Sequence, residues 1–139
     1  MEATHKPRTV SILADHNIEG WAILLWQIIT SEGWSDLCPM KLIMFSDVGL
    51  SDNANDRVVW RFAQAQKMIL LTANRNMEGD DSLEQTIRNE NTLTSLPVLT
   101  IANLDSLKNK TYREACAERL LEIVFDLENY LGTARIFTP

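Results

Sequence analysis

Short apolar runs alternate with helical stretches along the 139-residue chain, and this alternation limits its fold more than any other feature. Strands that alternate with helices form βαβ units, whose strands lie parallel in one sheet with helices on both faces. Parallel strands are covered on both sides, so they read as unbroken apolar runs, as in residues 68–71. We therefore expect one α/β domain of three layers, α/β/α, with a mainly parallel central sheet. The expected strands are residues 9–14, 41–45, 68–72, 97–101 and 135–138, and the expected helices are residues 18–31, 57–66, 82–89 and 112–131.

Charge and cysteine content restrict the class of protein. A net charge of −6 and an isoelectric point of about 4.8 argue against a protein coated in nucleic acid, although they allow a local basic rim. Cys38 and Cys116 lie far apart in sequence, which favours two reduced thiols in a cytoplasmic protein. Residues 1–10 lack the apolar core of a secretory signal, and the apolar stretch 20–30 is too short to cross a bilayer. We expect no membrane association.

Acidic and amide residues follow the ends of the apolar runs. Asp15 follows the first expected strand, Asp56 opens a helix, and Asn74 and Asn76 follow the third strand. In open α/β sheets, ligands bind at the carboxyl ends of the strands, where the strand order reverses. Carboxylate oxygens suit a hard cation such as Mg²⁺, so the pattern predicts a metal-dependent phosphoryl-transfer site.

Each of these side chains has a competing structural role. Asp15 and Asp56 can cap a turn or a helix. Asn17 can cap the helix that follows, or it can orient Asp15 or a water and contact the substrate. Asp80 and Asp81 can supply further metal ligands, or they can cap and stabilise the expected helix 82–89.

Three arginines are candidates for binding phosphate. Arg57 and Arg61 lie one helical turn apart just after Asp56, and Arg75 lies in the loop after the third strand. Arginine suits two-pronged recognition of phosphate, and the alternative is ordinary surface charge.

The first expected helix is apolar on almost every side, and it contains Trp21 and Trp26. A surface helix should carry a single apolar stripe, so this helix is either deeply buried or packed against another chain. We favour an interface, because aromatic anchors dominate interfaces. The expected assembly is a homodimer or a complex with a partner protein.

Three segments resemble the PIN-like nucleases, in particular the short group regarded as toxins of toxin–antitoxin pairs. The first segment, residues 12–17, is similar to the family's opening strand that ends in Asp. The second, residues 51–63, is similar to the acidic residue that opens the family's middle helix. The third, residues 69–76, is similar to a strand followed by a Thr-x-Asp-x-Asp pattern, but Asn74 and Asn76 stand where the family has Asp.

The resemblance implies a compact α/β/α fold and cleavage of RNA that depends on Mg²⁺ or Mn²⁺. It implies that Asp15 and Asp56 are the principal metal ligands, and that an antitoxin-like protein is a partner. An amide oxygen can bind Mg²⁺ but carries no charge, so the two Asn residues remove two negative charges from the site. The alternative function is therefore a weak or inactive PIN-like domain that binds protein or RNA. A phosphoacceptor domain fits less well, because the strand ends lack its acidic pair, its second Asp and its Lys.

Overall fold

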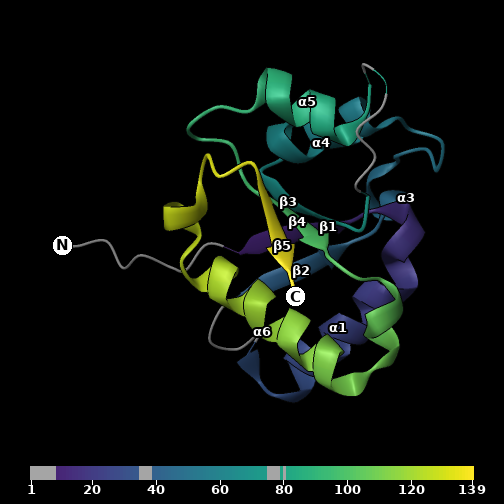
Figure 1. Cartoon of the computed structure of the whole chain (residues 1–139), viewed down its shortest axis with the longest axis vertical. Coiled ribbons are helices and arrows are strands. Elements are labelled where there is room, and N and C mark those ends of the chain that lie inside the picture. Colours follow the sequence, from purple (N-terminus) through teal and green to yellow (C-terminus); the bar gives the residue numbers. More distant parts are fainter. Residues whose placement is uncertain (1–8, 35–38, 75–78, 80) are drawn as a thin grey trace.

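A computed structural model describes residues 9–34, 39–74, 79 and 81–139. Within these residues one five-stranded sheet forms the centre of the fold, and every neighbouring pair of strands is parallel (Figure 1). The strands are β1 (Val10–Ala14), β2 (Met40–Ile43), β3 (Met68–Thr72), β4 (Val98–Ile101) and β5 (Arg135–Thr138).

Helices cover both faces of the sheet, so the three-layer α/β/α architecture expected from the sequence is confirmed (Figure 1). The α-helices are α1 (Glu19–Ser31), α3 (Phe45–Val48), α4 (Asp56–Ala65), α5 (Leu83–Glu90) and α6 (Lys110–Phe125), and the 3-10 helices are η1 (His16–Ile18), η2 (Asp105–Lys108) and η3 (Leu127–Tyr130). The pair α1 and α6 packs against one face, and the pair α4 and α5 packs against the other.

The strand order is β2-β1-β3-β4-β5. The chain moves from β1 to one side of the sheet for β2 and then crosses to the other side for β3. The order therefore reverses between β1 and β3, and open sheets bind ligands at such a point. The pairing of these two strands continues past β1, since the Asp15 N–H donates to the Leu71 carbonyl at 2.9 Å.

Alternation along the strands divides the core into two parts. Ile12 and Ala14 face the α1 and α6 layer, whereas Leu13 and Leu70 face the α4 and α5 layer. Successive strand residues point to opposite faces. The residues that continue the second set past the strand ends therefore point to the α4 and α5 side, and Asp15 is one of them.

Side-chain caps set the starts of α4 and α5, whereas α1 begins without one. The Asn55 side chain accepts the Val58 N–H and caps α4, and Asp56 lies in the first turn of that helix. The prediction that Asn17 caps the first helix is wrong: Asn17 lies inside η1, and α1 begins after it without a side-chain cap. Ser82, and not Asp81, caps α5 by accepting the Gln85 N–H. Asp80 lies outside the described residues.

Two expected boundaries differ from the structure. The helix expected at 112–131 ends at Phe125, where Asp126 leaves helical geometry and η3 follows. Gly132 therefore ends no α-helix, although its φ of +82° needs glycine. The expected strand 41–45 ends at Ile43, and the short helix α3 follows it, stabilised by the Asp47 carboxylate accepting the Met44 N–H.

The apolar helix α1 is half covered by its own chain. Trp21 and Trp26 are partly buried and pack against the core between α1, α6 and the sheet. Ile23 and Leu24 point outward and are 46% and 39% exposed.

Across the described part of the chain, no helix has the length and apolarity needed to cross a membrane. Cys116 is buried, and Cys38 lies outside the described residues.

Candidate functional site

The candidate site lies at the carboxyl ends of β1 and β3, on the side of the sheet covered by α4 and α5. Asp15 reaches it from the end of β1, Asp56 from the first turn of α4, and Asn74 from the segment after β3. Three of the residues that the sequence predicts as metal ligands thus come from the point where the strand order reverses.

Asp15 is bound on the β3 side by a short hydrogen bond. The Thr72 hydroxyl donates to its Oδ2 atom at 2.6 Å. Burial raises the pKa of the Asp15 carboxyl above its ordinary value, and the nearby Asp56 carboxylate raises it further. Hydrogen bonds from Thr72 and from the backbone N–H groups of His16 and Asn17 act in the opposite direction. The net direction of the pKa shift is upward, so burial and Asp56 together outweigh the hydrogen bonds to the Asp15 carboxylate.

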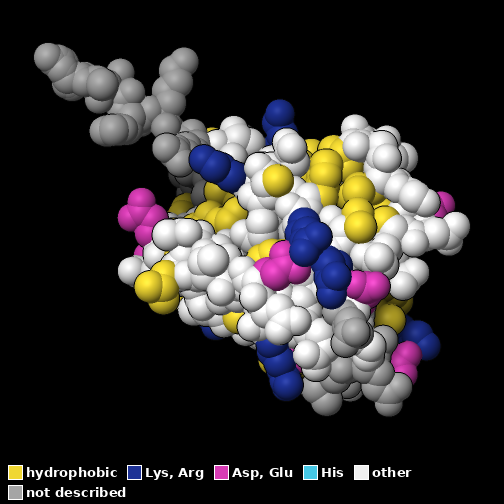
Figure 2. Space-filling model, turned by 90° about the horizontal axis from the view of Figure 1, so that it is seen from above, with side chains coloured by type: hydrophobic (Ala, Val, Ile, Leu, Met, Phe, Trp, Pro, Cys, Tyr) yellow, Lys and Arg dark blue, Asp and Glu magenta, His cyan; other side chains and the backbone are white. Residues whose placement is uncertain are grey.

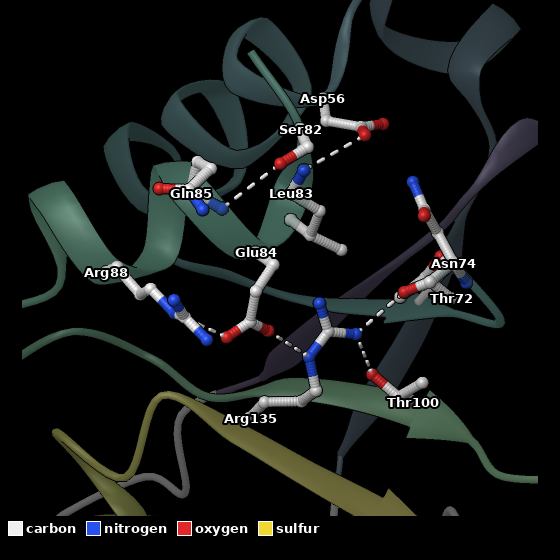
Figure 3. Close-up of polar contacts among 10 residues, drawn as sticks. All are labelled: Asp56, Thr72, Asn74, Ser82, Leu83, Glu84, Gln85, Arg88, Thr100 and Arg135. Atoms are coloured by element: carbon white, nitrogen blue, oxygen red, sulfur yellow. Dashed lines mark hydrogen bonds and ion pairs between the residues drawn. The ribbon is translucent and has the colours of Figure 1, made fainter. Parts of the chain in front are cut away.

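Asp56 joins two helices. It lies in the first turn of α4, and its Oδ2 atom accepts the backbone N–H of Leu83, the first residue of α5, at 3.0 Å (Figure 3). This contact satisfies one of the N–H groups that a helix start leaves without an intrahelical partner. Asp56 therefore has a structural role in addition to its place beside Asp15.

Asn74 has its backbone fixed at both ends. Its N–H donates to the Thr72 hydroxyl at 2.9 Å, and its carbonyl accepts the Arg135 Nη1 at 2.7 Å (Figure 3). The Thr72 hydroxyl therefore accepts from Asn74 while it donates to Asp15. In Figure 3 the Asn74 side chain points toward Asp56. Asn76 lies outside the described residues.

The sequence analysis missed three residues of this site. Arg135 from β5 donates to the Thr100 hydroxyl at 2.7 Å and forms an ion pair with Glu84 at 3.4 Å (Figure 3). The sequence did offer one indication, because Arg135 is a charged residue inside an expected strand. In the structure, Thr100 is a buried residue that pairs in register with Thr72. β5 lies at the edge of the sheet, yet the Arg135 side chain is only 9% exposed, and a charge with so little exposure needs partners.

The predicted phosphate-binding arginines are held in ion pairs. Arg61 makes a two-pronged contact with Glu90 at 2.7 and 3.0 Å, and Arg57 pairs with Asp81 at 3.1 Å and with Glu90 at 3.8 Å. Figure 2 views the α4 and α5 layer from above and shows basic and acidic side chains side by side across it. These ion pairs tie α4 to α5, and a phosphate would have to compete with them. Arg75 lies outside the described residues.

Asn17 lies at the edge of the site and is exposed. Its neighbour His16 points toward two other acids, with its Nδ1 atom 3.2 Å from Asp52 and 3.4 Å from Glu19. Asp52 therefore contacts the turn after β1 and does not add to the Asp15 and Asp56 pair.

The donor atoms are of the types that a hard cation takes. No three His, Cys, Asp or Glu side chains within the described ranges are spaced to hold a metal ion together. However, Mg²⁺ is commonly bound through one or two carboxylates and keeps several waters. Asp15 and Asp56 can supply the two carboxylates, and Asn74 can supply a neutral amide oxygen.

Comparisons of the chain with models of protein families, with curated proteins and with solved structures found no match.

Proposed function

We propose that this protein is a PIN-like ribonuclease that uses Mg²⁺ or Mn²⁺ to cleave RNA. One observation supports the proposal most strongly. Asp15 lies at the reversal point of the sheet, and burial together with the charge of the nearby Asp56 raises the pKa of the Asp15 carboxyl. Two carboxylates that repel each other in a partly buried site favour a cation between them. The resemblance to PIN-like nucleases supplies RNA as the substrate.

Each residue of the proposed site has its own role. Asp15 and Asp56 hold the cation, and Thr72 orients Asp15 through its hydroxyl. Asn74 offers a neutral oxygen ligand where the family has a carboxylate. A divalent ion bound there would polarise a phosphoryl oxygen and lower the pKa of a bound water. The cellular setting that we propose is a cytoplasmic toxin held inactive by an antitoxin-like partner.

The proposal is tested by incubating a mixed-sequence single-stranded RNA with the purified protein in Mn²⁺ or Mg²⁺, and in EDTA. We expect cleavage that requires the metal. In Asp15→Asn the rate should fall to the level seen in EDTA, because an amide replaces the buried carboxylate. The matched control is Asp105→Asn, which makes the same change at an exposed carboxylate in η2 and should cleave at the wild-type rate.

A second candidate function has its own support. The Asp56 carboxylate already accepts the Leu83 N–H. Arg57 and Arg61 form ion pairs with acidic side chains, and the Asn74 side chain carries no charge. These features favour a weak or inactive PIN-like domain that binds protein or RNA. Folded protein that cleaves no RNA with either metal, but shifts RNA in a binding assay, would support this second function and reject the first.

A further inference from the structure

A buried arginine lies beside the proposed metal ligands. The Arg135 side chain is 9% exposed, and its guanidinium contacts the Asn74 carbonyl, the Thr100 hydroxyl and the Glu84 carboxylate (Figure 3). A buried charge must be paired and hydrogen-bonded to be tolerated, and these three contacts come from three different elements. Its position is therefore set by the fold.

A continuous chain of hydrogen bonds links this arginine to Asp15. Arg135 donates to the Asn74 carbonyl, the Asn74 N–H donates to the Thr72 hydroxyl, and that hydroxyl donates to Asp15. The donor–acceptor distances along it are 2.7, 2.9 and 2.6 Å. Arg135 thus belongs to the same polar network as the proposed ligand Asp15.

The site is divided into two unequal sides. The side formed by β1 and α4 carries the carboxylates Asp15 and Asp56. The side formed by β3, β4 and β5 carries hydroxyls, an amide and a guanidinium. Among the described residues, the carboxylate that contacts this side is Glu84 from α5, and it is shared between Arg135 at 3.4 Å and Arg88 at 3.2 Å.

We infer that the site takes one divalent ion, and that the guanidinium of Arg135 is a fixed cation on the side where a second ion would lie. This inference rests on the proposed metal-dependent function. Among the described residues, that side offers a second ion the Glu84 carboxylate, which two arginines already share, and the nearby guanidinium would repel the ion. Arg135 sets the charge of the site and positions Asn74 through its carbonyl.

The first test counts the ions bound by the full chain. Mn²⁺ is titrated into wild-type protein, and free Mn²⁺ is followed by electron paramagnetic resonance. We expect one ion per chain, with no spin coupling between ions. Two coupled ions would overturn the inference and leave the proposed function intact. No bound ion would overturn both the inference and the proposed metal dependence.

The second test removes the charge. Arg135→Gln keeps an amide donor but loses the cation, so Mn²⁺ should bind more tightly, by about threefold or more. The matched control is Arg88→Gln, which removes the 61% exposed arginine on the other side of the same Glu84 and should change the affinity less than about twofold, since exposed charges are screened.

Circular dichroism shows whether each variant folds. Equal affinity in folded Arg135→Gln and wild type would reject a charge-setting role for Arg135. If Arg135→Gln fails to fold, the ion count on wild type still decides the inference.

Discussion

The Thr72 hydroxyl makes two hydrogen bonds inside the site. It donates to Asp15 and accepts from the Asn74 N–H, and its residue is fully buried. Removal of this hydroxyl takes one hydrogen bond from the Asn74 N–H and one from the Asp15 carboxylate, both partly buried, and a lost partner in such a place costs more than the hydrogen bond itself contributes. Substitution of Thr72 should therefore affect both Asp15 and Asn74.

We expect Thr72→Val to lower the free energy of unfolding by about 1–3 kcal/mol at neutral pH, measured by urea denaturation. The pKa of Asp15 should rise further, because the Thr72 hydrogen bond lowers it. The pKa is measured by NMR titration of the Asp15 carboxyl. Thr111→Val, at an exposed threonine in α6, is the control and should leave the pKa of Asp15 unchanged.

The sign of the pH dependence follows from the direction of the shift. The folded pKa of Asp15 lies above its ordinary value of 3.8, so the charged carboxylate costs stability above the folded pKa. This cost disappears below the unfolded pKa. The difference in unfolding free energy between Thr72→Val and wild type should therefore be larger at neutral pH than at pH 3. A constant difference across that range would contradict the proposed coupling to Asp15.

At the scale of single residues, the sequence located the ends of β1 and β3 and the start of α4, because each motif is local. It missed Arg135 and Glu84, since their pairing joins β5 to α5 and depends on tertiary structure. It gave Asn17 a capping role because it could not show that a 3-10 turn would separate Asn17 from α1.

At the scale of elements, two glycines differ in whether their position tolerates a side chain. Gly132 has a φ of +82°, and a Cβ there would meet the Leu93 carbonyl oxygen at 2.8 Å. Gly20 lies in α1 with open space around the position of a Cβ. Gly132 is therefore needed for the turn before β5, whereas Gly20 only weakens a helix.

We expect Gly132→Ala to lower the free energy of unfolding by about 1–3 kcal/mol, because it combines an unfavourable backbone with a steric clash. Gly20→Ala is the matched change, and it should raise the free energy of unfolding by up to about 1 kcal/mol, as alanine favours helix. Urea denaturation measures both. A stable Gly132→Ala variant would mean that the turn before β5 can shift at little cost.

The elements themselves were largely predictable. Four helices and all five strands lie near their expected positions, because unbroken apolar runs and helical periodicity are local signals. The break at Asp126 was not predictable, since the turn at Gly132, which follows η3, is held against Leu93 and Ser95, residues distant in the sequence.

At the scale of the whole molecule, α1 raises the question of assembly. Trp26 packs against the core of its own chain, so its aromatic surface stabilises the fold, whereas Leu24 lies on the exposed side. The predicted homodimer or partner complex would therefore use the outer side of α1. The sequence could not separate these two sides, because both are apolar.

We expect Trp26→Ala to lower the free energy of unfolding by about 2 kcal/mol or more through lost packing, while the mass measured by light scattering stays as in wild type. Leu24→Lys should leave stability within about 0.5 kcal/mol of wild type. If α1 joins two chains, Leu24→Lys should reduce the mass from that of a dimer to that of a monomer. A monomeric wild type would refute the homodimer.

The position of Arg135 on the last of the five strands has a consequence for protein synthesis. Asp15, Asp56 and Asn74 all emerge from the ribosome before Arg135 does. Until β5 pairs with β4, the Asn74 carbonyl lacks the donor that fixes it in the folded protein. A growing chain therefore carries every proposed metal ligand before it can hold them in register, and the site is completed only when the sheet is.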